Sequence, residues 1–198
     1  MVHPINIMIP AGTLNGIAAL NDLSLAISNS SLGLIWRVEI ERGTYGIMIR
    51  DNTTATSTTL GPNLVVNGIR VLGSYLYYVN SPQRSLYRIR LDKSGNTVGQ
   101  PETIAQGVLV DDFAATSSWA FPASFTDNII TNVSHNGKVH VVAGGRDSTA
   151  VMTATSAAVG RTKHNGNLLY IMTGGETQEP VHNTDHKGGK IVVLNPDV

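Results

Sequence analysis

Cysteine is absent from the 198-residue chain. Its absence excludes a disulfide-stabilised scaffold, a thiol nucleophile and a cysteine-ligated zinc or iron–sulfur site. Lysine and arginine together number 14, as do aspartate and glutamate. Because this balance comes without any basic run, no nucleic-acid scaffold is expected. Charged residues make up only 14% and hydrophobic residues 41% of the chain, a composition that excludes a disordered protein.

Long apolar runs are also missing. No stretch approaches the roughly 18 consecutive apolar residues of a membrane-spanning helix, so none is expected. The start of the chain, Met1–Pro4, shows no basic region followed by an apolar one, so no signal peptide is expected in this chain. Three N-glycosylation sequons, at Asn29, Asn52 and Asn132, leave open the secretion of a longer precursor. The localisation therefore stays unknown.

The apolar residues that are present form short runs of strand length rather than helical stripes. Turn signals with glycine, which accounts for 20 residues, separate these runs, and asparagine and glycine adopt positive φ at little cost. The segment 51–59, made mostly of Thr, Asn, Ser and Ala, is expected to be an exposed loop. This pattern predicts one all-β domain. The runs are Leu76–Val79, Val139–Ala143, Leu168–Met172 and Ile191–Leu194, and the turns are Ser94–Asn96, Asn136–Gly137 and Asn165–Gly166.

An internal repeat gives the domain its expected architecture. Asn15-Gly16-Ile17 aligns with Asn67-Gly68-Ile69, and the strand Trp36-Arg37-Val38 aligns with Tyr87-Arg88-Ile89. Weaker copies begin at Asp111 and near Thr155. A repeat of roughly 40 to 50 residues with four short strands indicates β-propeller blades. We therefore expect an all-β propeller with four blades of four antiparallel strands, over residues 12–50, 63–107, 108–150 and 151–198.

These repeated segments carry a family resemblance over nearly the whole chain. The sequence resembles the SMP-30/gluconolactonase-like six-bladed propellers, and more closely their fungal branch, whose members are called hetero-Diels–Alderase-like. The family has six blades, whereas four are expected in this chain. Asn15 resembles the start of the family's third blade, so the four blades correspond to the third to sixth blades of the family. The residues that carry the resemblance are Leu14–Gly16, Val66–Ile69, Leu76–Ser81, Leu86–Ile89, Asp111–Ala114, Thr155–Ala158, Gly160–Thr162, Leu169–Tyr170 and Gly174–Gly175.

The metal-dependent lactonases of this family hold a divalent cation at one mouth of the central channel. The resemblance implies Asn67 and Asp111 as ligands, with Asn15 as a further channel residue near the substrate. Hard oxygen ligands suit Ca²⁺ or Mg²⁺, which would polarise a lactone carbonyl and acidify water. The family's glutamate ligand has no counterpart in this chain, so the ligand set is incomplete.

The fungal branch implies a different and cofactor-free chemistry, the hetero-Diels–Alder cyclisation of a polyketide-derived quinone methide with a terpene. Such a reaction needs an apolar pocket that holds both reactants together and a hydrogen-bond donor for the heterodiene. The catalytic candidates are Asn15, Asn67 and Asp111, and the substrate-binding candidates are Asp112, Phe113, Trp119, Thr155 and Ser156. We expect those at the blade starts to converge at one mouth of the channel.

Plainer interpretations stay open beside these. Asn-Gly is a turn signal in any fold, so the repeated pairs could simply cap the starts of the blades. The carboxylates of Asp111 and Asp112 could bind backbone amides in a tight loop. The chain could also be a non-catalytic binding propeller or an inactive fragment. A small-molecule substrate is the expected partner, with no nucleic acid or membrane. Four blades of a six-blade pattern leave two open faces, so we also expect self-association or a further segment that completes the ring.

Overall fold

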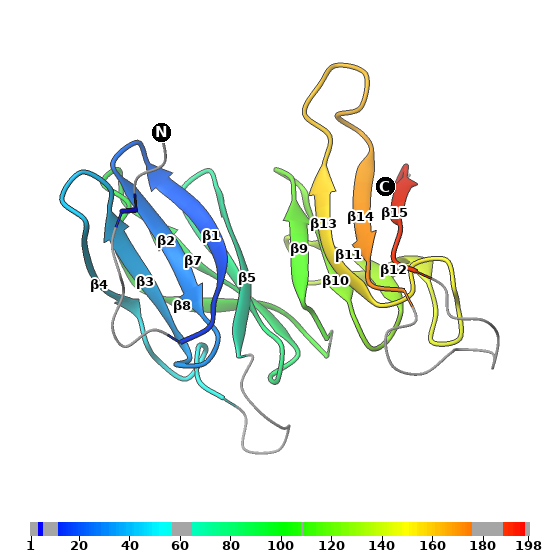
Figure 1. Cartoon of the computed structure of the whole chain (residues 1–198), viewed down its shortest axis with the longest axis horizontal. Helices are drawn as coiled ribbons and strands as arrows, with labels where there is room; N and C mark the ends of the chain where they lie inside the picture. Colours follow the sequence, from blue (N-terminus) through cyan, green and yellow to red (C-terminus); the bar gives the residue numbers. More distant parts are fainter. Residues whose placement is uncertain (1–3, 6–11, 57–64, 108, 176–187, 197–198) are drawn as a thin grey trace. The chain divides into compact units, whose positions relative to one another are not determined.

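The structure is a computed structural model that describes residues 4–5, 12–56, 65–107, 109–175 and 188–196. These residues form fifteen strands and no helix, in four antiparallel sheets (Figure 1). The chain divides into two compact units, residues 1–106 and 107–198, with two sheets in each. No helix among the described residues is long and apolar enough to cross a membrane. The predicted all-β class is confirmed.

The first unit contains the sheets that we call blade 1 and blade 2. Each is a meander in which sequential strands pair antiparallel, as the short turns between them require. Blade 1 consists of β1 (Leu14–Asn21), β2 (Ser24–Asn29), β3 (Leu34–Glu39) and β4 (Thr44–Ile49). Blade 2 consists of β5 (Val66–Leu72), β6 (Tyr75–Asn80), β7 (Ser85–Leu91) and β8 (Thr97–Gln106).

The two blades of this unit pack face to face through one hydrophobic core, with their first strands β1 and β5 side by side. Alternation along each strand sends one set of side chains into this core. Blade 1 contributes small and aliphatic residues such as Ala26 and Ile35, and blade 2 contributes larger ones such as Ile69 and Tyr78. All four are fully buried. This is the packing of neighbouring propeller blades.

The loop between the blades departs from its predicted exposure. Thr54 is fully buried, and blade 2 binds the loop through several side chains. Asn80 donates from Nδ2 to the carbonyl oxygens of Thr53 and Ala55, each at 2.9 Å. The hydroxyl groups of Thr53 and Tyr78 lie 2.5 Å apart. The loop is therefore attached to the blade mainly through its backbone carbonyl groups, while Asp51, Asn52 and Thr56 are exposed as predicted. Residues 57–59 of the predicted loop lie outside the described residues.

The second unit contains blade 3 and blade 4, which share a separate core. Ala123 and Ile130 of blade 3 pack there with Leu169 and Ile171 of blade 4, and none of the four is exposed. Blade 4 has three strands among the residues described, where four were expected. Blade 3 consists of β9 (Asp112–Ala115), β10 (Trp119–Ser124), β11 (Ile129–Ser134) and β12 (Val139–Gly144), and blade 4 of β13 (Ala154–Val159), β14 (Leu169–Thr173) and β15 (Ile191–Leu194).

The turn signals of the sequence all fall between paired strands. Ser94–Asn96 joins β7 to β8, Asn136–Gly137 joins β11 to β12, and Asn165–Gly166 lies between β13 and β14. Gly95 and Gly137 have φ of 79° and 80°, which glycine adopts without strain. The four predicted apolar runs lie in or coincide with strands β6, β12, β14 and β15.

Candidate functional site

The first strands of blades 1 and 2 begin with the two predicted asparagines, and the structure joins these strand starts. Ser28 accepts a hydrogen bond from the amide of Gly16 at 2.7 Å and donates to the carbonyl oxygen of Asn67 at 2.6 Å. A β-carbon on Gly16 would stand 2.8 Å from that same oxygen. Glycine at this position therefore lets β1 approach β5, which gives the Asn-Gly pair a structural role.

The two asparagines make the same contact in each copy of the repeat. Asn15 donates from Nδ2 to the hydroxyl of Ser30 at 3.2 Å, and Asn67 donates to that of Ser81 at 3.4 Å. They differ in access, because Asn15 is exposed while Asn67 is only 3% exposed. Of the two, Asn15 has the amide that a ligand can reach without displacing neighbouring residues.

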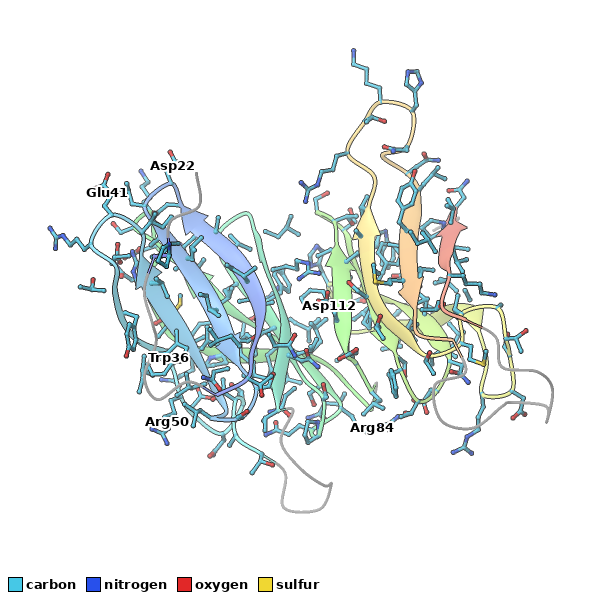
Figure 2. All side chains as sticks on the ribbon, viewed as in Figure 1. Asp22, Trp36, Glu41, Arg50, Arg84 and Asp112 are labelled. Atoms are coloured by element: carbon cyan, nitrogen blue, oxygen red, sulfur yellow. The ribbon has the colours of Figure 1, made fainter. Side chains whose placement is uncertain are left out.

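The second unit joins its own two strand starts through a carboxylate. Ser156 of β13 donates to Oδ2 of Asp112 on β9 at 2.8 Å, so equivalent positions of neighbouring blades meet. Asp112 is labelled in Figure 2. Asp111 and Asp112 are both half-buried. Thr155 donates instead to the carbonyl oxygen of Met172 in its own blade, at 3.4 Å. Phe113 is fully buried, as a core residue is.

Trp119 lies at the other end of blade 3. In the register of β9 and β10, Asp112 pairs with Ala123 and Ala115 pairs with Ala120, which puts Trp119 beyond the far end of β9. There it lines a cavity of about 370 Å³ together with Phe121 and Leu169. The structure therefore does not bring Trp119 to Asp112. Asn15 and Asn67 belong to one unit and Asp111, Thr155 and Ser156 to the other, and the convergence of the full set stays a prediction.

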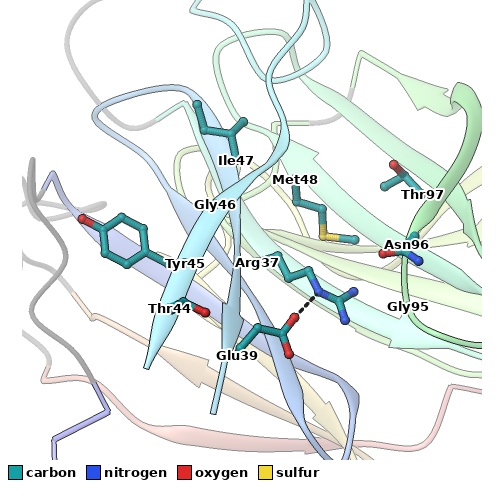
Figure 3. Close-up of a pocket in the computed structure, with 10 residues that line it drawn as sticks. All are labelled: Arg37, Glu39, Thr44, Tyr45, Gly46, Ile47, Met48, Gly95, Asn96 and Thr97. Atoms are coloured by element: carbon teal, nitrogen blue, oxygen red, sulfur yellow. Dashed lines mark hydrogen bonds and ion pairs between the residues drawn. The ribbon is translucent and has the colours of Figure 1, made fainter. Parts of the chain in front are cut away.

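A second cavity, of about 310 Å³, lies in the first unit and was not predicted from the sequence (Figure 3). It lies where β3 and β4 of blade 1 meet the β7–β8 turn of blade 2. Nε of Arg37 donates to Glu39 at 2.6 Å, and its Nη2 donates to the carbonyl oxygen of Ser94 at 3.0 Å. The guanidinium group therefore links the two blades.

The metal ligands implied by the lactonase resemblance have little support in the geometry of either unit. Among the described residues, no group of three or more His, Asp or Glu side chains could hold a metal ion. Asn67 and Asp111 lie in different units, so neither unit alone contains both implied ligands. Within each unit the donor set is too small for Ca²⁺, which takes roughly six to eight oxygen ligands.

Sequence comparison relates the chain to two curated proteins, and no protein-family model matches it. A protein from Sarocladium schorii that is named a hetero-Diels–Alderase is 29% identical over 156 residues, covering 70% of this chain and 39% of that protein. Another with this name, from a Phoma species, is 26% identical over 152 residues, covering 71% and 42%. The chain thus spans about two fifths of the length of these relatives.

Structural comparison identifies the fold. A calcium-binding regucalcin from Agrobacterium tumefaciens superposes with a TM-score of 0.62 at 16% identity, covering 91% of this chain and 59% of that one. A luciferin-regenerating enzyme gives a TM-score of 0.62 at 13% identity, covering 92% and 62%. These likenesses confirm the predicted fold. The chain is thus similar in sequence to proteins named hetero-Diels–Alderases, and it has the β-propeller fold of the SMP-30/regucalcin type.

Proposed function

We propose that this chain acts in the cyclisation of small molecules by a hetero-Diels–Alder reaction, as part of a propeller of fungal secondary metabolism. The observation that carries the proposal is the similarity to two proteins with that name over about 70% of the chain. The reactants would be a polyketide-derived quinone methide and a terpene alkene. Both are largely apolar, and their cycloaddition transfers no electron or proton to the protein.

The exposed start of the first strand of blade 1 is the proposed reaction site. A quinone methide carries a carbonyl oxygen that gains negative charge in the transition state when C–C bond formation runs ahead of C–O bond formation. A hydrogen-bond donor aimed at this oxygen stabilises the transition state more than the ground state. Asn15, which is exposed, is the donor proposed, because its Nδ2 uses one hydrogen on Ser30 and carries a second. Ser156 gives its one hydroxyl hydrogen to Asp112 and has none left for a reactant. Asn67 is nearly buried and is assigned the role of positioning the strand.

Proximity is the second contribution that the protein would make. Holding two reactants in a near-attack geometry removes the translational and rotational entropy cost of a bimolecular step, which is worth up to roughly 7–11 kcal/mol. Trp119 offers a flat apolar wall in the 370 Å³ cavity of the second unit. Because that cavity lies away from Asp112, at the other end of blade 3, we assign it the binding of an apolar part of a reactant.

The lactonase alternative is supported by fold alone, through a regucalcin described as calcium-binding. It requires Asn67 and Asp111 to share one divalent cation with further oxygen ligands. The cyclase and the lactonase differ in one respect that is simple to test, because only the lactonase needs a divalent ion in the chemical step. Loss of activity on chelation would favour the lactonase.

The test is a cycloaddition with an ortho-quinone methide released in solution from a stable precursor and a terpene alkene as partner. We expect the protein to form one enantiomer in excess over the racemic background, as measured by chiral chromatography, with no effect of EDTA. Asn15→Ala should lower the rate of the catalysed reaction by about tenfold or more, as loss of a transition-state donor does. Asn136→Ala, an exposed amide in the β11–β12 turn, is the matched control.

Two results would contradict the proposal. One is a racemic product at the background rate with a folded protein. The other is hydrolysis of a chromogenic lactone that EDTA abolishes and added Ca²⁺ or Mg²⁺ restores, which would establish the lactonase instead.

A further inference from the structure

The cavity of the first unit, which the proposed cyclisation does not use, lies beside Arg37 (Figure 3). In the register of β3 and β4, Arg37 pairs with Gly46, and a β-carbon on Gly46 would meet no atom within 4 Å. On its other side Arg37 pairs with Ala26 of β2. Directly paired residues project from the same face of a sheet. Two small neighbours therefore leave room beside the guanidinium group, and the cavity of about 310 Å³ lies there.

Blade 2 shows which chemical group fits beside this arginine. Arg88 is the counterpart of Arg37 in the repeat, and it pairs with Glu102 of β8 and Tyr77 of β6. Its Nε and Nη2 lie 2.9 Å and 2.8 Å from Oε2 of Glu102. Where blade 2 carries a hydrogen-bonding side chain, blade 1 therefore carries glycine. The cavity of blade 1 occupies the position of a group that binds the guanidinium.

The charge of the cavity is balanced within blade 1. Glu39 lies two residues beyond Arg37 on the same strand and accepts a hydrogen bond from its Nε at 2.6 Å. The side chains of Arg37 and Glu39 are 23% and 37% exposed, so both remain open to a ligand. An ionic ligand would find the pair already neutral and would bring a charge without a partner. The cavity therefore fits an uncharged ligand.

The same pair places a hydrogen-bond donor next to an acceptor. Nη2 of Arg37 uses one hydrogen on the carbonyl oxygen of Ser94 and carries a second. Arg37 binds Oε1 of Glu39, and Oε2 is a second acceptor. Because each hydroxyl group both donates and accepts, two neighbouring hydroxyls of one ligand match this pair. Thr44 and Thr97 line the same cavity and add hydroxyls of the same dual capacity.

The β7–β8 turn that borders the cavity is held in shape by its own hydrogen bonds. Asp92 accepts from the backbone amides of Ser94 and Asn96 at 2.8 Å and 2.9 Å, and from Nδ2 of Asn96 at 3.0 Å. Figure 3 shows the side chain of Met48 extending from β4 toward this turn, as an apolar surface beside the polar groups. A preformed site of this kind loses little conformational entropy on binding. Its volume suits a ligand of one ring, because ligand pockets begin at roughly 300 Å³.

We propose that this cavity binds an uncharged polyhydroxylated ring, a sugar or a cyclic polyol, through two adjacent hydroxyl groups. One hydroxyl accepts a hydrogen bond from Arg37 and its neighbour donates one to Glu39, while the ring carbons contact Met48. All the residues involved belong to the first unit, and none of them is assigned to the cyclisation. The cavity is therefore a second binding site, with a ligand chemistry of its own.

A titration followed by two-dimensional NMR of the ¹⁵N-labelled chain tests the ligand class. The probes are methyl β-D-glucopyranoside and cis-1,2-cyclohexanediol, and cyclohexanol is the matched ring without the hydroxyl pair. We expect both probes to bind with dissociation constants of about 1 mM and to shift the amide signals of Gly46, Asn96 and Thr97, which line the cavity. Cyclohexanol should bind about fivefold or more weakly, because it lacks one of the two hydrogen bonds.

Gly46→Glu tests the position of the site, because it gives blade 1 the carboxylate that Glu102 supplies in blade 2. The new side chain should bind Arg37, fill the cavity and weaken binding of both probes by about tenfold or more. Val98→Glu is the matched control. Val98 is 42% exposed and follows Thr97 on β8, so alternation directs its side chain to the opposite face. This variant should bind the probes as the parent does, and both should keep the far-ultraviolet circular dichroism of the parent.

Several outcomes would overturn the proposal. One is a parent protein whose amide signals do not move with either probe, and another is equal affinity for cyclohexanol and the diol. Shifts confined to the second unit would place the binding elsewhere. A folded Gly46→Glu variant that binds both probes as tightly as the parent would show that the space beside Arg37 is not the site.

Discussion

Gly16 lies where two blades approach each other most closely in the first unit. A β-carbon there would stand 2.8 Å from the carbonyl oxygen of Asn67 and 2.9 Å from the amide nitrogen of Ile69. Because both neighbours are backbone atoms of a paired strand, they cannot move aside cheaply. We expect Gly16→Ala to lower the free energy of unfolding by about 1–3 kcal/mol, as overpacking does, measured by urea denaturation.

The control for this substitution is Gly46→Ala in the same blade. A β-carbon on Gly46 would meet no atom within 4 Å, so this change should alter stability by less than about 1 kcal/mol. Equal effects of the two substitutions would show that Gly16 acts through the unfolded chain, and the close approach of β1 to β5 would then have no energetic weight.

For single residues, the sequence predicted which residue types lie at the strand starts but not how exposed their side chains are. The Asn-Gly pairs correctly predicted where the first strands of blades 1 and 2 start. At both starts the asparagine donates to a serine of the same blade at a similar spacing in the sequence. The burial of Asn67 could not be predicted, because it depends on neighbouring strands distant in sequence. Two of the three sequons illustrate the same limit. Asn29 is 0% and Asn132 2% exposed, which leaves only Asn52 of the three accessible in the folded chain.

Among the elements, the loop 51–56 contacts a buried tyrosine of blade 2, because the hydroxyl groups of Thr53 and Tyr78 form a hydrogen bond. Burial, the main cause, raises the pKa of Tyr78 far above its ordinary value of 10.0, although the hydrogen bond with Thr53 opposes this. The folded protein therefore holds the phenolic proton more tightly than the unfolded chain does. The stability that this contributes is fully present below about pH 10 and is lost as the pH rises above it.

We expect the free energy of unfolding to fall more steeply with pH in the parent protein than in Tyr78→Phe, by up to about 1.4 kcal/mol per pH unit above pH 10. Urea denaturation between about pH 9 and 11 measures both slopes. Parallel slopes for the two proteins would mean that Tyr78 ionises as readily when folded as when unfolded.

Strands and turns were the elements best predicted from sequence, because alternation and turn chemistry are local properties. Within the loop 51–56, Asp51, Asn52 and Thr56 are exposed as predicted, but the burial of Thr54 was missed. The loop's backbone carbonyl groups accept hydrogen bonds from Asn80 and Gln83, which lie far along the chain. Trp119 was grouped with Asp111 for a similar reason. Its distance from that site follows from the pairing of Asp112 with Ala123, and spacing in the sequence does not specify this register.

For the whole molecule, the two units have separate cores, so we expect them to unfold independently of each other. Each unit contains one of the two tryptophans of the chain, Trp36 in the first and Trp119 in the second. The variants Trp119→Phe and Trp36→Phe therefore leave one fluorescent reporter per unit. Ile69 and Ile130, each 0% exposed, lie in the first and second cores respectively. Removing a methylene from either should destabilise its own unit by about 0.5–1.5 kcal/mol.

We expect Ile130→Val to lower the urea midpoint reported by Trp119 by about 0.5 M and to leave that of Trp36 nearly unchanged, with the reverse for Ile69→Val. The physical reason is that each isoleucine packs only within its own core, and distant sites without shared partners contribute additively. Equal shifts of both reporters would instead show that the four blades unfold as one cooperative body. The separate core of each unit would then not define an independent unit of folding.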